Sequence, residues 1–441
     1  MPRLTLTQAA AALQRGETTA TALVEEALQR AEAHRELNAI AWLDPSDALE
    51  QAAARDRARQ TGQPAGLLHG IPLTVKDLFN VRGTKTQAGS RAPLPPFDDG
   101  LPEALAVTRL REAGAVILAK TNLQELALGL TGENPWTGDV KNPRDPARQS
   151  GGSSSGAAVA VAVRIGLGAL GSDTAGSIRL PASFCGVVGF KPSYGRVPTA
   201  GSLPLVPSCD HAGPLAQTVE DVAVLFSVLA GIPPVPLALE RSPRLAVPRA
   251  YLEGRLTRPV RIAFEALLER LASAGAHVCE VALDIPDPTV VFAPLRAESA
   301  LIHREALEAC PERFSEPVRT ALLRGFEFRA VDYLAARKQQ LHMREGLHQA
   351  MAHAEALLLP AAPCVAPPRG TTCIELESGQ ADLRQAILWL TLPAALGGLP
   401  ALALPFDQVE GLPIAVQVIA PFGEDARALQ VSYWIERILR S

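Results

Sequence analysis

The sequence has few of the residues on which small disulfide-bonded or metal-bound proteins depend. Its 441 residues include six cysteines and eight histidines. The cysteines form no C-x-x-C pair, and no histidine stands near them at the spacing of a zinc site. Scattered cysteines in a long chain are typical of reduced thiols in a cytosolic protein. We therefore expect a cytoplasmic protein with neither a disulfide framework nor a metal centre.

Strong charge and long apolar segments are also absent. The 42 basic and 46 acidic residues give a net charge of −4 and are interspersed along the chain. This balance favours neither nucleic acid nor an anionic membrane as a partner. The first residues lack the apolar run of a secretory signal. Because no uninterrupted apolar stretch reaches the roughly 18 residues of a transmembrane helix, we expect no membrane span.

Lysine is scarce beside arginine. The lysines among the basic residues are Lys76, Lys85, Lys120, Lys141, Lys191 and Lys338. Arginine supplies positive charge, but its side chain cannot be deprotonated in a protein. In a chain so rich in arginine, a lysine is a better candidate than usual for chemistry that needs a neutral amine. Most of the lysines are still expected to lie on the surface or in salt bridges.

Predicted helices alternate with short and almost wholly apolar strands. Helical periodicity covers residues 18–33, 47–58 (with Ser46 as the N-cap), 105–113, 260–274 and about 424–439. Apolar strands are predicted at residues 71–75, 115–119, 277–283, 356–359, 401–404 and 414–419. This alternation predicts an α/β fold in which helices cover both faces of a central sheet.

Residues 150–195 are the most informative segment. Gly or Ser fills positions 151–156, and a helix (157–165) and a strand (167–170) lead to a second small-residue turn at 171–177. Such turns let backbone N–H groups approach a ligand. A phosphate-binding loop would need Lys-Ser/Thr where two alanines follow Gly156. A hydrolase nucleophile elbow would need an apolar strand before residue 150. A flexible linker is disfavoured by the apolar sequence on both sides.

The same segment carries a family resemblance. Gly151-Gly152-Ser153-Ser154 is followed, 24 positions after Ser153, by the serine of Gly176-Ser177-Ile178-Arg179. This pair of motifs resembles the amidase signature family of serine hydrolases. Further matching segments occur in family order: HGIPLTVKD (69–77), KTNLQE (120–125), FCGVVGFKP (184–192), DHAGP (210–214) and GLPIAVQ (411–417). Together they span almost the whole chain.

The resemblance implies a Ser–Ser–Lys triad. By position, Ser177 is the nucleophile, Ser153 the bridging serine and Lys76 the base. A serine hydroxyl attacks well only when its proton is removed. Ser153 can accept that proton while passing its own to Lys76, which must be uncharged and therefore buried. The activity implied is hydrolysis of a carboxylic amide through a Ser177 acyl-enzyme, without a metal or cofactor.

The resemblance also implies roles around the triad. The Gly152–Ser153 peptide bond is expected to be cis, and Ser154 is expected to support the triad. Asp173 and Arg179 are expected to hold the turn at residues 174–177, the nucleophile turn. The expected oxyanion donors are the backbone N–H groups of Thr174, Ala175, Gly176 and Ser177. Two positions depart from the family pattern, since Ala157 and Ala175 replace glycines, and Ala175 disfavours positive φ.

The family further implies one domain over residues 1–441, with a mixed, mostly parallel central sheet and a catalytic core at about 66–225. The expected partner is a small-molecule amide, and a homodimer is allowed. One alternative is the glutaminase subunit of a tRNA-dependent amidotransferase, which would require a partner subunit; another is an allophanate or ureido-amide hydrolase. Residues 286–390 contain no recognisable glutamine-binding motif, which favours a hydrolase acting alone. A non-catalytic relative is disfavoured by the retained triad residues.

Some residues near these motifs have ordinary explanations. Without the resemblance, Ser153, Ser154 and Ser155 would be read as turn residues and Ser177 as a helix N-cap. His69 and His211 are expected to pack or to form hydrogen bonds. Cys185 follows Ser177 closely but has no partner motif, and we expect it in the core.

Overall fold

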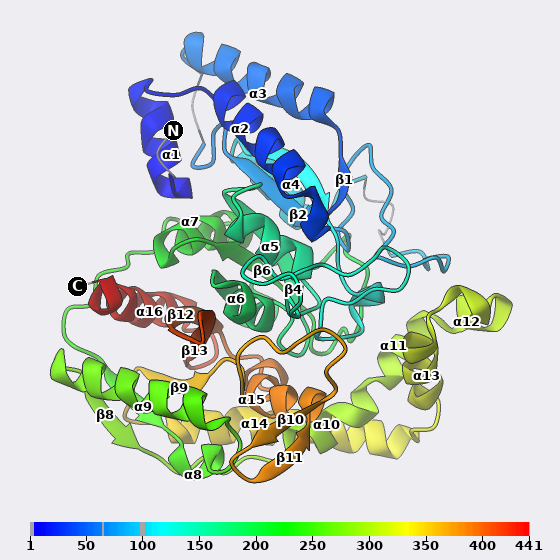
Figure 1. The fold of residues 1–441 in the computed structure, drawn as a ribbon, viewed down its shortest axis with the longest axis vertical. Helices are drawn as coiled ribbons and strands as arrows, with labels where there is room; N and C mark the ends of the chain where they lie inside the picture. The colour runs from blue at the N-terminus through cyan, green and yellow to red at the C-terminus, as the bar shows by residue number, and fades with distance from the viewer. Residues whose placement is uncertain (1–3, 64–65, 98–101, 441) are drawn as a thin grey trace.

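The computed structural model describes residues 4–63, 66–97 and 102–440 (Figure 1). Its main element is an 11-stranded sheet with the order β1-β3-β2-β4-β6-β5-β12-β13-β9-β7-β8. The strands are β1 Ile40–Leu43, β2 Pro72–Lys76, β3 Val116–Thr121, β4 Gly168–Asp173, β5 Val188–Lys191, β6 His211–Ala216, β7 Arg244–Val247, β8 His277–Glu280, β9 Ala356–Pro360, β12 Ala401–Val409 and β13 Leu412–Ile419. A separate hairpin pairs β10 (Cys373–Leu376) with β11 (Gly379–Asp382).

The sheet is mixed, as expected, but its parallel pairs are confined to two groups. Strands β3, β2 and β4 are parallel neighbours, and so are β9, β7 and β8. The other neighbouring pairs among the described strands are antiparallel. The parallel share is therefore smaller than the family resemblance implied. One cause is the two-residue loop between β12 and β13, where Glu410 and Gly411 adopt φ of 54° and 77°; so short a loop can join only antiparallel strands.

Helices cover both faces of the sheet. The longer ones are α1 Leu6–Arg15, α2 Ala20–Ala33, α3 Pro45–Gln60, α4 Leu105–Glu112, α5 Ser155–Ala162, α7 Val219–Ala230, α9 Arg258–Ser273, α14 Ala330–Ala350, α15 Leu383–Leu396 and α16 Asp425–Arg440. Strand β3 shows the two-sided burial. Val116 and Leu118 pack in a cluster with α2 and α3, whereas Ile117 packs in the cluster that contains α4. Successive side chains of a strand point to opposite faces, so helices must cover both.

Most predicted elements are found within a few residues of their expected ends. The prediction of Ser46 as the N-cap of α3 is wrong. The N-cap is Asp44, whose carboxylate accepts the backbone N–H groups of Ser46 and Asp47. Pro45 then occupies the first helical position, where its missing N–H does no harm. Strand β4 runs to Asp173, beyond the predicted 167–170. This extension places more residues in the strand, directly before the nucleophile turn.

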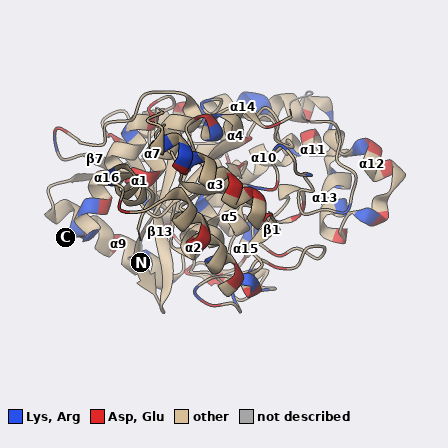
Figure 2. Cartoon of the chain, turned by 90° about the horizontal axis from the view of Figure 1, so that it is seen from above, with Lys and Arg blue, Asp and Glu red and all other residues tan. Residues whose placement is uncertain are grey.

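A helical region beside α15 was not predicted from the sequence. It comprises α10 Pro288–Leu295, α11 Ala297–Ile302, α12 Arg304–Ala309, α13 Glu316–Gly325 and α14, and it forms the lower right of Figure 1. In the view of Figure 2, basic and acidic residues are interspersed over the outer helices. Within the described ranges, no helix combines the length and the apolar character that crossing a membrane requires.

Candidate active site

Parallel pairing of β2 with β4 brings Lys76 to the serines. Leu73 pairs with Gly168 and Val75 with Leu170, so the carboxyl ends of the two strands meet at one edge of the sheet. Lys76 is the last residue of β2. Its Nζ lies 2.7 Å from Ser153 Oγ and 2.8 Å from Ser172 Oγ, near the end of β4.

The Lys76 amine is enclosed. The residue is 0% exposed, and burial lowers the pKa of its amine to about 7, although the Asp173 and Asp210 carboxylates oppose this shift. An uncharged amine has one lone pair, with which it can accept a proton from Ser153 while donating to Ser172. The site therefore contains a lysine that can be neutral near neutral pH and touches two hydroxyl groups.

The segment around Ser153 is tied to the nucleophile turn. The Gly152–Ser153 peptide bond is cis, as expected. The N–H of Ser154 donates to the Ser177 carbonyl (3.2 Å), and the Ser154 hydroxyl donates to the Ser172 carbonyl (3.0 Å). Ser177 is 4% exposed, and its hydroxyl has no hydrogen bond to the part of the chain that the structure describes. That hydroxyl is therefore not committed to a structural contact within those residues.

A buried carboxylate holds the nucleophile turn from inside. Asp173 accepts the backbone N–H groups of Gly176 (2.7 Å) and Ile178 (3.1 Å). It also forms an ion pair with Arg179 at 2.9 Å, in which neither side chain is exposed. Burial alone would raise the pKa of the Asp173 carboxyl, but the ion pair and hydrogen bonds with Arg179 hold that pKa well below its usual range. The pair is thus charged, and the turn is built around it.

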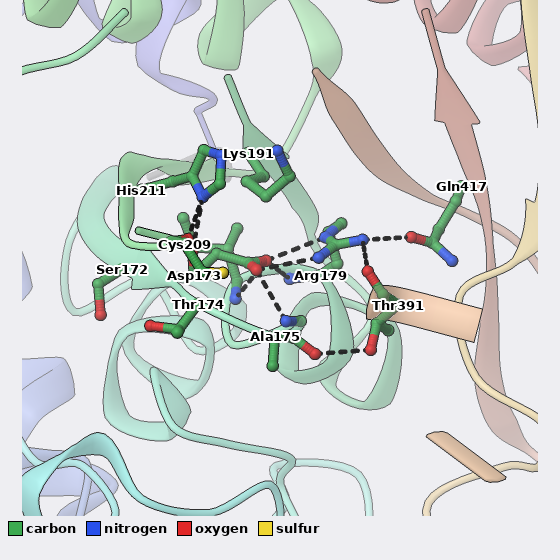
Figure 3. Close-up of polar contacts among 12 residues, drawn as sticks. Ser172, Asp173, Thr174, Ala175, Arg179, Lys191, Cys209, His211, Thr391 and Gln417 are labelled. Atoms are coloured by element: carbon green, nitrogen blue, oxygen red, sulfur yellow. Dashed lines mark hydrogen bonds and ion pairs between the residues drawn. The ribbon is translucent and has the colours of Figure 1, made fainter. Parts of the chain in front are cut away.

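Residues from distant segments complete this network (Figure 3). The Arg179 guanidinium donates to the Thr391 carbonyl (2.8 Å) and to Gln417 Oε1 (2.7 Å). The Thr391 hydroxyl donates to the Ala175 carbonyl (2.6 Å). Thr391 lies on α15 and Gln417 on β13. The sequence placed Gln417 in a family-like segment without a role and gave no signal for Thr391 or Ser172.

The N–H groups expected to bind an oxyanion differ in their availability. Those of Thr174, Ala175 and Ser177 have no acceptor within the described residues. The Gly176 N–H does not fit the expectation, because it donates to the Asp173 carboxylate. The positive φ of this turn falls at Gly176 (121°) and not at Ala175. Alanine at position 175 is therefore compatible with the turn.

The remaining candidates from the sequence have structural contacts. Lys120 is buried in an ion pair with Asp77 at 2.6 Å. Lys191 is also buried, with its Nζ donating to the Leu399 carbonyl. Cys185 lies in the core, where burial raises the pKa of its thiol. His69 Nε2 lies 3.0 Å from the Arg55 carbonyl. Across residues 4–63, 66–97 and 102–440, no group of three or more His, Cys, Asp or Glu side chains is arranged to hold a metal.

Comparisons with known proteins agree on one family. The sequence profile of the amidase family matches residues 22–429. Among curated proteins, the chain is 35% identical to a glutamyl-tRNA(Gln) amidotransferase subunit of Ralstonia nicotianae, with 98% of this chain and 97% of that protein covered. The protein of the same name from Deinococcus radiodurans is 36% identical, with 98% and 97% covered.

Solved structures are similar over equally long ranges. A crystal structure of an amidase matches with a TM-score of 0.96 and 51% identity, covering 98% of this chain and 99% of that one. The peptide amidase of Stenotrophomonas maltophilia matches with a TM-score of 0.83 and 28% identity, covering 100% of this chain and 98% of that one. The similarity therefore includes the outer helices as well as the central sheet.

We predict that Arg179→Met destabilises the protein by about 3–5 kcal/mol, because it leaves the buried Asp173 carboxylate without its partner. A matched control is Arg35→Met, which breaks the Arg35–Glu32 pair, whose side chains are 77% and 75% exposed. That change should cost no more than about 1 kcal/mol. Urea unfolding of the two variants measures both values, and equal losses would contradict a structural role for the Asp173–Arg179 pair.

Proposed function

The chain belongs to the amidase signature family, whose members are hydrolases that act on amide C–N bonds, and we propose that it is a stand-alone amidase that works through an acyl-enzyme on Ser177. The observation that carries this proposal is the contact of the buried Lys76 amine with the Ser153 hydroxyl. The next residue, Ser154, donates its backbone N–H to the Ser177 carbonyl and so keeps this segment beside Ser177. The proposed products are a carboxylic acid and ammonia or an amine.

In the proposed mechanism, Ser177 Oγ attacks the amide carbonyl carbon. Ser153 takes the Ser177 proton as the new C–O bond forms, and passes its own proton to Lys76. The 2.7 Å approach of Lys76 Nζ to Ser153 Oγ and the lowered pKa of the amine support this direction of transfer. Ser172, at 2.8 Å from Nζ, holds the amine in place while its lone pair faces Ser153.

The second half of the mechanism returns the proton. The carbonyl oxygen becomes an anion, for which the uncommitted N–H groups of Thr174, Ala175 and Ser177 are the proposed donors. Ser153 then donates the proton that it took from Ser177 to the leaving nitrogen and regains one from Lys76, and the C–N bond breaks. Water then attacks the acyl carbon and gives a proton to Ser153 while Ser153 passes its own to Lys76. The bond between the acyl carbon and Ser177 Oγ breaks, that oxygen regains a proton through Ser153, and the acid is released. Asp173, Arg179 and Ser154 support this geometry and take no part in the proton transfers.

An amidotransferase component is the second candidate function. It is favoured by the relatives that carry that name and cover nearly the same length. Such a component would hydrolyse glutamine and act together with a partner protein. The stand-alone assignment is favoured by the 51% identity to a structure described only as an amidase and by the absence of a glutamine-binding motif from the sequence of residues 286–390.

Organisation and location are part of the proposal. We propose residues 66–225 as the catalytic core, since Lys76, Ser153 and Ser177 all lie there; residues 98–101 of that core lie outside the described residues. The six cysteines are unpaired, which supports a cytoplasmic location. The proposed partner is a small-molecule amide.

We predict that Ser177→Ala abolishes ammonia release from a panel of small amides and prevents labelling by a fluorophosphonate probe. Lys76→Arg should lower the rate by about 10²- to 10⁴-fold, because a guanidinium cannot accept the proton. Lys338→Arg is the matched control, since Lys338 is exposed, and it should leave the rate unchanged. Equal activity of Lys76→Arg and the wild type would refute the assignment of the base.

The pH dependence of kcat/KM should show an acidic limb with an apparent pKa of about 7, the value to which burial lowers the pKa of Lys76. Below that pH the amine is protonated and cannot act as a base, so the rate falls; above it the rate reaches a plateau. Burial also lowers the pKa of Lys191 to about 7. The limb should therefore persist in Lys191→Met. A limb that disappears in this variant belongs to Lys191 and not to the proposed base.

The two candidate functions differ in what the purified chain does alone. A stand-alone amidase, expressed without other proteins, should release ammonia from several small amides. An amidotransferase component should act on glutamine alone and gain activity when its partner protein is supplied. Ammonia release by the isolated chain, with glutamine and with non-amino-acid amides compared side by side, decides between them.

A further inference from the structure

His211 contacts the backbone directly before the nucleophile turn. It is the first residue of β6, and it pairs with Asp173, the last residue of β4. The side chain is buried, and its Nδ1 lies 3.1 Å from the Asp173 carbonyl oxygen and 2.6 Å from the Cys209 carbonyl oxygen. In Figure 3 the imidazole lies on one side of the turn, and Thr391 and Gln417 lie on the other.

These contacts fix the tautomer of the ring. A carbonyl oxygen can only accept a hydrogen bond, so Nδ1 must carry the proton and donate it to both oxygens. Burial and the nearby Lys191 hold the pKa of His211 well below its usual value. The ring is therefore neutral, with its proton on Nδ1. Its Nε2 is buried and has no partner within the described residues.

Holding the Asp173 carbonyl also directs an N–H group. The carbonyl of residue 173 and the N–H of Thr174 belong to one planar trans peptide and point in opposite directions. Because His211 Nδ1 holds the carbonyl on the side of β6, the Thr174 N–H must point away from that strand. That N–H has no acceptor in the described part of the chain, unlike the N–H of Gly176.

The next peptides of the turn are held by other groups. The peptide between Ala175 and Gly176 is fixed at both ends, by the Thr391 hydroxyl at its carbonyl and by Asp173 at its N–H. The carbonyl of Gly176 accepts the N–H of Leu180, at the start of the following helix. The carbonyls of Asp173, Ala175 and Gly176 thus have different donors, and the Asp173 carbonyl is the one that accepts a hydrogen bond from the His211 imidazole.

We propose that His211 is a positioning residue that aims the Thr174 N–H at the oxyanion formed during attack by Ser177. This inference rests on the proposed function, because it requires a charged oxygen at the turn. His211 itself takes no proton from the substrate. Its contribution is made in advance, by fixing the peptide plane before the reaction begins, so that no reorientation is needed when the charge forms.

Three substitutions separate hydrogen bonding from packing. In His211→Asn, the side-chain amide can place an N–H donor where Nδ1 stands. In His211→Gln, the donor lies one bond further out, near the place of Nε2. In His211→Leu, the volume is kept in part and no donor remains. If the ring only fills space, the three variants should differ in stability and not in catalysis.

The test measures kcat, KM, the rate of fluorophosphonate labelling and the thermal midpoint for each variant. We expect His211→Leu and His211→Gln to lose about 10- to 100-fold in kcat and in labelling rate, since a misdirected donor weakens stabilisation of the charged oxygen. KM should stay within about threefold of wild type, because the interaction forms in the transition state. His211→Asn should recover most of the loss.

Two results would overturn the proposal: wild-type kcat in His211→Leu, or equal losses in the Asn and Gln variants. If His211→Leu does not fold, the comparison of Asn with Gln decides alone. Ser177→Ala, measured in parallel, keeps the two hypotheses apart. Residual activity in Ser177→Ala would refute the acyl-enzyme itself, whereas an inactive Ser177→Ala beside a fully active His211→Leu would refute only the role of His211.

Discussion

The enclosure of the Lys76 amine is the constraint on which the proposed chemistry of this site depends. A lysine in water keeps its proton near neutral pH, and only loss of hydration makes the neutral form accessible. A carboxylate placed beside the amine would cancel that effect. The nearest one in sequence, Asp77, is instead held by Lys120 at 2.6 Å. Lys76 is left with two hydroxyl groups as its hydrogen-bond partners, and these do not force it to stay charged.

The second constraint is the rigidity of the nucleophile turn. The residues between Asp173 and Arg179 surround a buried ion pair, which is expensive to bury and is stable only when its other hydrogen bonds are also made. Thr391 and Gln417 make those bonds with Arg179. In the proposed mechanism, a network that fixes the N–H groups in advance leaves little reorganisation for the moment at which charge develops.

The sequence predicted the parts of this site that lie in contiguous motifs. The family resemblance proposed Lys76, Ser153, Ser177, Asp173 and Arg179 by position, and the structure brings them together. The two strands that end at Lys76 and Asp173 were predicted to within a few residues. The contacts of Ser172, of Thr391 and of His211 with the Asp173 carbonyl were not predicted. Ser172 was missed because β4 continues past the apolar residues that predicted it, and the added residues include Ser172, which contacts Lys76. The Thr391 hydroxyl contacts the carbonyl of Ala175, a residue more than 200 positions earlier in the sequence. Local periodicity cannot detect such a contact. The share of antiparallel strands was underestimated because most neighbouring strands are distant in sequence, although the two-residue loop between β12 and β13 is a local signal for one antiparallel pair.

The turn that carries Ser177 depends on distant residues, and residues 66–225 therefore cannot form an independent folding unit. Residues 66–225 contain the three proposed catalytic side chains, yet the turn that carries Ser177 is held by a helix and a strand from beyond residue 380. Strand β5 of that core also pairs directly with β12. Removal of the C-terminal half would leave Arg179 without two of its acceptors and β5 with an open edge. The core is therefore a unit of sequence and not a unit of folding, and the chain has to be treated as one domain.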